Sequence, residues 1–292
     1  MYQCTNYYES IGLKMKLDKQ QNNRNIQNML RNYIYFLSAI VFFGFYCVFI
    51  EPNMLTLNHY TIQNEQLQNI KIVFVSDFHV SSSDKKRLDK IIQKINAEKP
   101  DIVLSVGDYV NGHKHDSTMP IEDIAKSLAQ IKSKYGFYTT LGNHDGWYGN
   151  DRIKQAFEQN GITVLANGNT GVNISDKMIY IAGVEDLGTG KPDIKKAVNN
   201  TLSPVILLTH NPDIFPDVPD FVTLTLAGHT HGGQIRIPFF GPIKTYSKYG
   251  AKYAYGYIAE NNKQMIVTKG IGTSILPIRF NCMPEIVIID FK

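Results

Sequence analysis

The sequence predicts an α/β protein with one N-terminal transmembrane helix, and three observations lead to this prediction. Residues 33–50 form an uncharged apolar run, short apolar segments alternate with helix-like segments from Lys71 onward, and polar clusters follow several of the apolar segments. The 292 residues suffice for one large domain with a substantial core. With 43% hydrophobic and 19% charged residues, the body is expected to be globular rather than disordered.

The charge and the cysteines exclude two classes of protein. The formal net charge is +4, part of it lies in the N-terminal segment, and no dense basic stripe follows, so a specific nucleic-acid partner is not expected. Only Cys282 of the three cysteines lies in the main body. A disulfide framework and a CxxC zinc site are therefore both excluded, and the cysteines do not indicate a redox compartment.

The apolar run near the N-terminus is long enough to cross a bilayer. Residues 1–32 form a polar, basic tail in which little packed structure beyond a frayed helix is expected, and residues 33–50 read YIYFLSAIVFFGFYCVFI. An 18-residue helix spans about 27 Å, close to the thickness of a bilayer core. A buried core helix and a cleaved signal peptide are the alternatives. The length of the run, and Glu51-Pro52-Asn53 in place of a small-residue cleavage site, favour an uncleaved anchor.

The charges around this run predict how the chain is oriented. Lys and Arg residues precede the run, whereas Glu51 and Glu65 follow it before Lys71. The positive-inside rule then places the N-terminus in the cytoplasm and the body outside, as in a single-pass protein of the cytoplasmic (inner) membrane. Residues 51–69 are expected to be a linker with at most one short strand, and residues 70–292 to be the globular domain.

The body alternates between strand-like and helix-like stretches. The expected strands are Lys71–Ser76, Asp101–Val106, Gly136–Leu141, Met178–Gly183, Val205–Thr209, Phe221–Ala227, Gln264–Lys269 and Glu285–Asp290. The expected helices are Asp84–Glu98, Ile121–Lys134, Asp151–Asn160 and Asp193–Asn199. Many of the strands are apolar without alternation, which is typical of strands covered on both faces. There is no internal repeat and no second domain boundary.

Five of these strands run directly into polar clusters. The side chains concerned are Asp77, His79, Asp108, Asn143, His144, Asp145, His210, His229 and His231. In open α/β sheets, ligands bind beyond the carboxyl ends of the strands, so we expect these side chains to lie together. Taken alone, Asp-x-His, Gly-Asp and Gly-Asn-His-Asp are more typical of turns and loops, and only Gly-His-x-His is as typical of a metal site. Their ordered combination after apolar strands indicates a shared site.

The side chains in these clusters suit divalent cations. Carboxylate, imidazole and amide groups bind Mn²⁺, Zn²⁺ and Fe²⁺, and one Asp can bridge two ions about 3.5–4 Å apart. Thiolates are lacking, so a structural zinc site is not expected. Two further histidines, His113 and His115, are interpreted as loop residues near the mouth of the site.

The ordered blocks D-x-H, G-D, G-N-H-D, H and G-H-x-H resemble those of the calcineurin-like metallophosphoesterase superfamily, over about Lys71 to Lys292. The segments LTHNPD, AGHTHGGQIRIP and KGIGTSILPIRF are similar to its YkuE/YaeI-like branch, whose members are often membrane-anchored or exported phosphodiesterases. The resemblance implies two mixed β-sheets packed as a sandwich flanked by helices. It also implies two divalent metal ions, which could be Mn, Zn or Fe.

The resemblance further implies a role for each residue. The expected ligands are Asp77, His79 and His231 for the first metal, Asn143, His210 and His229 for the second, and Asp108 as the bridge. His144 is expected to be the general acid or to contact the phosphate, and Asp145 to orient His144 or a neighbouring loop. Asn143 and Arg279 are expected to contact the substrate, although a surface ion pair is an equal alternative for Arg279. Asn111 replaces an Asp that is common in the family. This position is not expected to bind a metal directly, so the change affects only the residues around the ligands.

These roles imply a dinuclear phosphoesterase that hydrolyses a phosphodiester or pyrophosphate bond. The anchor favours a lipid-linked substrate over a free phosphate-containing small molecule, and UDP-2,3-diacylglucosamine is one example from this branch. That substrate is cytoplasmic, which conflicts with an outward-facing body. The alternatives are a broad phosphomonoesterase or nuclease, and a non-catalytic membrane-binding module. Five tyrosines between Tyr246 and Tyr257 predict either hairpin packing or a lip that holds the substrate.

Overall fold

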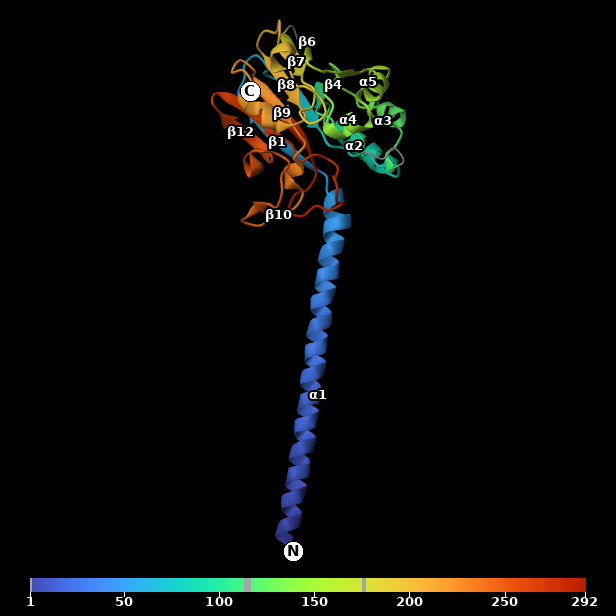
Figure 1. Ribbon diagram of the computed structural model, residues 1–292, viewed down its shortest axis with the longest axis vertical. Helices are drawn as coiled ribbons and strands as arrows, with labels where there is room; N and C mark the ends of the chain where they lie inside the picture. Colours follow the sequence, from blue (N-terminus) through green and yellow to red (C-terminus); the bar gives the residue numbers. More distant parts are fainter. Residues whose placement is uncertain (1, 113–116, 175–176) are drawn as a thin grey trace. The chain divides into compact units, whose positions relative to one another are not determined.

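A computed structural model describes residues 2–112, 117–174 and 177–292 of the chain (Figure 1). The chain forms two compact units, Met1–Phe49 and Ile50–Lys292. The first unit is helix α1 (Tyr2–Phe45), and the short η1 (Tyr46–Ile50) follows it. Its apolar part has a mean hydropathy of 2.2 and is long and apolar enough to cross a membrane. A signal sequence meets the same criterion.

The first sheet of the body has six strands in the order β1-β14-β2-β3-β4-β5. Their bounds are β1 (Thr56–Ile62), β2 (Lys71–Val75), β3 (Ile102–Ser105), β4 (Phe137–Thr139), β5 (Ile162–Val164) and β14 (Glu285–Phe291). Strands β2 to β5 are parallel, and β14 runs antiparallel to β2. The carboxyl ends of β2, β3 and β4 therefore lie at one edge of the sheet.

The second sheet also has six strands, in the order β12-β13-β9-β8-β7-β6. Their bounds are β6 (Gly168–Ile174), β7 (Lys177–Gly183), β8 (Val205–Thr209), β9 (Leu224–Ala227), β12 (Gly256–Glu260) and β13 (Lys263–Val267). Strands β7, β8, β9 and β13 are parallel, so the carboxyl ends of β8 and β9 share an edge. A small separate ribbon is formed by β10 (Arg236–Ile237) and β11 (Gly241–Pro242).

The two sheets pack face to face around a core of aliphatic side chains. Fully buried members from both sheets include Ile72, Phe74, Leu104, Ile206, Leu224 and Ile266. The outer face of the first sheet is covered by α2 (Lys85–Ala97), α3 (Ile121–Leu128) and α5 (Asn150–Glu158). The outer face of the second is covered by α6 (Ile194–Ala197), η4 (Pro212–Asp217) and η6 (Gly250–Tyr253). The predicted sandwich of two mixed sheets flanked by helices is confirmed.

Some segments differ from the sequence-based expectation. The stretch 51–69 begins with η2 (Glu51–Asn53) and contains β1, which pairs with β14 along its whole length, so it is part of the domain rather than a linker. The alternation of exposed and half-buried residues in β1 carries little hydrophobic signal, which is typical of an edge strand. Helix α4 (Asn143–Tyr148) and the short η5 (His231–Gly233) begin inside the polar clusters, where their polar residues read as loops.

Candidate metal centre

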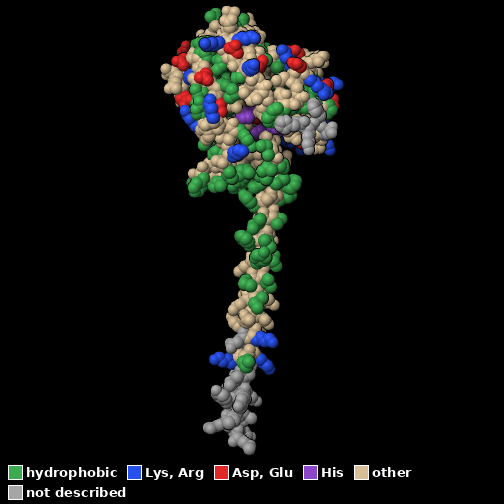
Figure 2. All heavy atoms as spheres, in the orientation of Figure 1, with side chains coloured by type: hydrophobic (Ala, Val, Ile, Leu, Met, Phe, Trp, Pro, Cys, Tyr) green, Lys and Arg blue, Asp and Glu red, His purple; other side chains and the backbone are tan. Residues whose placement is uncertain are grey.

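The two sheets deliver the predicted ligands to one place. Four of them, Asp77, His79, Asp108 and Asn143, follow β2, β3 and β4 of the first sheet. The other three, His210, His229 and His231, follow β8 and β9 of the second sheet. The imidazole groups are visible together in a hollow of the body surface (Figure 2). The carboxyl edges of both sheets thus meet at the site, as the strand-end pattern predicts.

Asp77, His79 and His231 form one group of donor atoms, which lie within 4.8 Å of one another. The Nε2 atoms of His79 and His231 are 3.0 Å apart, and Asp77 Oδ1 lies 3.6 Å from His231 Nε2. Two nitrogens bound to one cation at about 2.1 Å each would be separated by roughly 3–3.4 Å. The two imidazoles therefore have the spacing of ligands that share an ion.

Asn143, His210 and His229 form a second group beside the first. Asn143 Oδ1 lies 3.0 Å from His210 Nε2 and 2.9 Å from His229 Nδ1, and the two ring nitrogens are 3.1 Å apart. His210 Nδ1 is 2.8 Å from the carbonyl oxygen of Val106 and donates to it, which directs Nε2 into the group. This spacing also fits a shared cation.

The carboxylate of Asp108 lies between the two groups. Its Oδ2 atom is 3.5 Å from His79 Nε2 in the first group and 3.3 Å from His210 Nε2 in the second. Its Oδ1 atom accepts a hydrogen bond of 2.9 Å from the backbone N–H of His144. Asp108 is almost completely buried, and it is placed where a bridging ligand would be.

Burial sets the protonation of the histidines. It lowers the pKa of His79 to about 3, and together with the charge of His210 it lowers the pKa of His229 to about 4. Burial also lowers the pKa of His231 well below its usual value, so all three are neutral at pH 7, which is the form that binds metals. His210 and Asp108 form the remaining pair, and burial disfavours the charged form of each. The attraction between their charges is stronger, so it raises the pKa of His210 to about 10 and holds that of Asp108 well below its usual range.

The backbone of the site is strained. Asp77, His79, Asp108, His229 and His231 have positive φ angles between 43° and 70°, in the left-handed region that residues other than glycine seldom occupy. Such strain is typical of functional sites held by a rigid surrounding structure.

Glycine permits the close approach of the turns after β3 and β4. A Cβ atom on Gly142 would lie 2.2 Å from Asp108 Oδ1, and one on Gly107 would lie 2.1 Å from the backbone nitrogen of Gly142. Both distances are far below any real contact, so a larger residue at either position would move Asp108.

His144 borders the first group of donors and Asp108. Its Nδ1 atom is 3.2 Å from the carbonyl oxygen of Asn111, and its Nε2 atom is 3.3 Å from Ser274 Oγ. Its ring centre lies 4.5 Å from that of His79. Asn111 contacts His144 through its backbone, so the Asn at this position leaves the contact unchanged.

Asp145 positions the loops after β3 and β4. Its buried carboxylate accepts hydrogen bonds from the backbone N–H groups of Asp108 at 2.7 Å, Gly142 at 2.9 Å and Tyr109 at 2.9 Å. Burial and the charge of Asp108 raise the pKa of Asp145 to about 7, while the N–H donors act against this shift. Of the two roles expected for Asp145, the structure fits the orientation of a neighbouring loop.

Arg279 does not occupy the expected position. The side chain is completely buried, so neither a phosphate contact nor a surface ion pair is correct. Its guanidinium donates to the carbonyl oxygens of Lys269 at 2.8 Å, Gly272 at 2.6 Å and Cys282 at 2.8 Å. It therefore holds together the loop between β13 and β14. A pattern in the sequence cannot distinguish an arginine that faces a substrate from one that satisfies the carbonyl groups of its own loop.

A cavity of about 590 Å³ opens over the donor groups. It is lined by Asp108, Asn143 and His144, and also by residues that the sequence did not single out, namely Trp147, Asp186, Asn211 and Ser274. Asp186 Oδ2 accepts from the backbone of Gly188 and Thr189, whereas its buried Oδ1 has no hydrogen-bond partner among the described residues. Asn211 lies in the segment LTHNPD and Ser274 in KGIGTSILPIRF, whereas no motif marks Trp147 or Asp186, which only the fold brings to the site.

The tyrosine-rich segment contributes to both the cavity and the core. Tyr246 lines the cavity, whereas Tyr253 is fully buried and packs against Phe215 and Tyr249. A role of Tyr246 in holding a substrate stays a prediction. His113 and His115 lie outside the described residues, so their interpretation stays a prediction.

Comparisons with known proteins agree with this geometry. The family model for calcineurin-like phosphoesterases matches residues 70–233. An uncharacterized metallophosphoesterase, YkuE of Bacillus subtilis, is 33% identical over 261 residues, which cover 85% of this chain and 89% of YkuE. Phosphodiesterase YaeI of Escherichia coli is 32% identical over 232 residues, covering 75% of this chain and 81% of YaeI.

A third relative carries a membrane description. The transmembrane protein with metallophosphoesterase domain of Danio rerio is 29% identical over 254 residues, which cover 78% of this chain and 54% of that protein. The matched family residues are those that bring the two donor groups together, and they mark the chain as a metal-dependent phosphoester hydrolase. The chain belongs to the calcineurin-like phosphoesterase family.

Proposed function

We propose that the body hydrolyses a phosphodiester or pyrophosphate bond with two divalent cations held by the strand-end side chains. The proposed ligands are Asp77, His79 and His231 for one ion, Asn143, His210 and His229 for the other, and Asp108 for both. The observation that carries the proposal is the position of Asp108, with one oxygen 3.5 Å from His79 and 3.3 Å from His210. Oxygen and nitrogen donors without thiolate suit Mn, Zn or Fe.

The chain supplies the groups that bind the phosphate and move the proton. When bound, two such cations would provide a water molecule ionised near neutral pH and positive charge for the phosphate oxygens. His144 borders the cavity, and its Nδ1 atom lies against the carbonyl oxygen of Asn111. Its Nε2 atom is then the one able to protonate the leaving oxygen, a step typically worth about 10²–10⁴-fold in rate. Asn143, in the same cavity, is proposed to contact the substrate as well as a cation.

Replacing Asp108 with Asn tests the bridging role. The wild-type chain, purified and loaded with Mn²⁺, is expected to hold two ions and to hydrolyse bis-(4-nitrophenyl) phosphate. The variant is expected to lose turnover and to hold fewer ions, because both groups lose a shared negative charge. Asp151→Asn, at an exposed position in α5, is the matched control. A D108N protein with two ions and wild-type turnover would overturn the proposal.

The bond class is tested with paired substrates. The relative YaeI is named a phosphodiesterase, which supports a diester or anhydride bond. We therefore expect a higher kcat/KM for bis-(4-nitrophenyl) phosphate than for 4-nitrophenyl phosphate. A preference for the monoester, or efficient cleavage of DNA, would replace this proposal with a phosphomonoesterase or a nuclease.

We further propose that residues 33–50 anchor the chain in the cytoplasmic membrane, with the body outside. The apolar part of α1, the basic residues before it and the transmembrane relative support this proposal. The body, Ile50–Lys292, is the proposed catalytic domain. A topology reporter fused after Lys292 tests the orientation. An external reporter supports envelope phosphodiesters as substrates, whereas a cytoplasmic one overturns the orientation and favours a nucleotide-linked lipid such as UDP-2,3-diacylglucosamine.

A further inference from the structure

Large apolar side chains lie exposed on two adjacent loops of the body. The β10–β11 ribbon and the residue after it expose Phe239 (106%), Phe240 (88%) and Ile243 (63%), and the loop after β13 exposes Ile275 (76%) and Leu276 (52%). Figure 2 shows hydrophobic side chains gathered over the end of the body that carries β10. We call these five residues the apolar platform. Exposed patches of this kind usually mark an interaction site.

The two loops form one surface because Gln234 connects them. Its side-chain amide donates to the carbonyl oxygens of Ser274 at 3.1 Å and Leu276 at 3.3 Å, and it accepts from the backbone N–H of Ser274 at 2.5 Å. The backbone N–H of Arg236 also donates to the carbonyl oxygen of Phe280 at 2.9 Å. The platform is therefore held as a unit and is not a pair of independent loops.

The exposed charge beside the platform is positive. From Phe221 to Pro284 the chain has one acidic residue, Glu260, and seven basic ones. Arg279 and Lys263 are buried, and Lys252 and Lys269 pair with Glu260 and Glu285, which leaves Arg236, Lys244 and Lys248. Lys244 and Lys248 are exposed beside the ribbon. An apolar surface bordered by exposed cations fits an anionic lipid bilayer, where cations meet the head groups and apolar side chains enter the acyl boundary.

The platform is connected to the point where the apolar run of the chain ends. Glu51 is the first residue after that run, and its buried carboxylate accepts a hydrogen bond of 2.6 Å from the backbone N–H of Cys282. Cys282 lies in the same loop as Ile275 and Leu276. If residues 33–50 cross a bilayer, Glu51 lies at its surface, and the loop that carries the platform lies next to Glu51.

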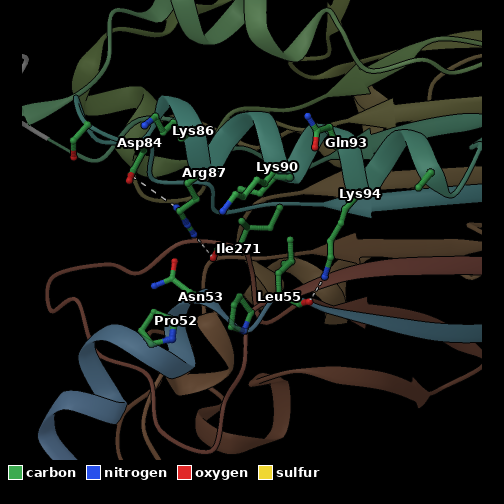
Figure 3. A pocket seen from close by; sticks show the side chains of 14 residues that line it. Pro52, Asn53, Leu55, Asp84, Lys86, Arg87, Lys90, Gln93, Lys94 and Ile271 are labelled. Atoms are coloured by element: carbon green, nitrogen blue, oxygen red, sulfur yellow. Dashed lines mark hydrogen bonds and ion pairs between the residues drawn. The ribbon is translucent and has the colours of Figure 1, made fainter.

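A second cavity, of about 780 Å³, lies on the other side of this loop and away from the metal donors (Figure 3). One wall is formed by Pro52, Asn53, Leu55, Ile271 and Pro284, and the other by α2 with Ser83 and Asp84 before it. This second wall, the basic wall, carries four basic residues, Lys86, Arg87, Lys90 and Lys94, and one acidic residue, Asp84, which pairs with Arg87 at 3.9 Å. Figure 3 shows Arg87, Lys90 and Lys94 directed from α2 toward the 52–55 segment.

The basic wall of this cavity retains unused positive charge. Arg87 donates to the carbonyl oxygen of Ile271 and Lys94 to that of Leu55. Within the described ranges, Lys86 and Lys90 form no hydrogen bond or ion pair. Cations beside the end of an anchor lie at the level of lipid phosphates, so this wall faces the same partner as the platform.

We propose that this end of the body docks on an anionic lipid bilayer, with the apolar platform inserted and the basic wall of α2 against the head groups. The metal cavity opens beside the platform, because Ile275 and its neighbour Ser274 both line that cavity, and Ser274 contacts His144. A phosphate group of a lipid could then reach the metal centre from the membrane surface. The docking rests on the proposed anchor and does not require hydrolysis.

Tryptophan reporters in the full chain test the docking directly. Trp147, the single tryptophan, is first replaced with Phe, and then Phe240→Trp or Leu276→Trp is introduced. The control is Leu202→Trp, which is 73% exposed and precedes β8, at the opposite edge of the sheet from the site. Each protein is reconstituted in phosphatidylcholine–phosphatidylglycerol vesicles, with and without lipids brominated on their acyl chains.

The platform reporters are expected to lose at least half of their emission to the brominated lipids and to shift to the blue, while Leu202→Trp is unchanged. The proposal is overturned if the brominated lipids quench the two platform reporters no more than they quench Leu202→Trp. A blue shift that depends on protein concentration, without quenching, also overturns it, because it indicates self-association. Omitting phosphatidylglycerol should reduce quenching about twofold, and no dependence on this lipid refutes the role of the basic wall. Because the readout is independent of turnover, loss of the proposed activity would leave it unaffected.

Discussion

Replacing Arg279 with Met separates a structural role for this residue from a role in substrate binding. The buried guanidinium donates to the carbonyl oxygens of Lys269, Gly272 and Cys282. Methionine fills much of the same volume and removes all of these hydrogen bonds. The loop that these bonds hold also braces the metal centre, because the backbone N–H of Gly272 donates to the carbonyl oxygen of Asp77 at 2.6 Å.

The expected loss of stability follows from these three carbonyl groups and that of Gly270, to which the guanidinium also donates at 3.2 Å. Each buried carbonyl left without a partner costs about 1–3 kcal/mol, and removing the buried charge offsets part of the sum. A net loss of about 3–5 kcal/mol is typical when one partner of a buried charged network is removed. In a domain of this size, 1 kcal/mol shifts Tm by about 2–4 °C, so Tm should fall by roughly 6–20 °C.

The measurement uses the full chain in detergent, with Tm from intrinsic fluorescence and with kcat and KM for bis-(4-nitrophenyl) phosphate. Arg152→Met is the control, because that side chain is 52% exposed and solvent screens its ion pair with Glu122, so Tm should change little. The reasoning is refuted if R279M keeps the wild-type Tm and instead raises KM several-fold. That result would restore a contact between Arg279 and the phosphate.

Three further substitutions test individual parts of the site. His144→Ala should keep the metal content and lower kcat by about 10²–10⁴-fold; loss of metal would make His144 a ligand instead. Asp145→Asn places an amide NH₂ group against backbone N–H donors, so both the free energy of unfolding, by about 2–4 kcal/mol, and the metal content should fall. Lost turnover at an unchanged Tm would instead indicate that Asp145 takes part in the reaction. Gly142→Ala adds a Cβ atom 2.2 Å from Asp108 Oδ1 and should weaken metal binding at least tenfold. Gly168→Ala, where the nearest atom would lie 3.9 Å from the new Cβ, should leave metal binding unchanged. If calorimetric titration gives both variants the wild-type metal affinity, the turn at Gly142 can move without displacing Asp108.

The sequence could predict the convergence of the ligands because two of their properties are local. Each expected ligand lies within a few residues of the end of an apolar strand, as Asp77 follows β2 and His210 follows β8. Parallel strands place their carboxyl ends at one edge, so position along the chain becomes position in space. The contacts of Asp108 with His79 and His210 then follow from the order of the strands in the two sheets.

The remaining features depend on tertiary contacts that no local pattern records. Strand β1 is half exposed and is defined by its pairing with β14, which lies more than 200 residues later. Arg279 has the sequence context of a surface loop, and only the carbonyl groups around it explain its burial. Asp186 reaches the cavity through the turn after β7, which has no metal-binding motif.

The proposed ligands carry less negative charge than two divalent cations carry positive charge. Among the seven proposed ligands, Asp77 and Asp108 carry the negative charge, and Asn143 contributes an uncharged oxygen. Two carboxylates leave half of the charge of two divalent cations uncompensated, so the cavity would attract an anionic phosphate. A third carboxylate in place of Asn143 would weaken that attraction. Asp186 lies in the same cavity and adds negative charge near His210 and His229. If these ligands hold two divalent cations as proposed, the site favours an anionic phosphate over a neutral group.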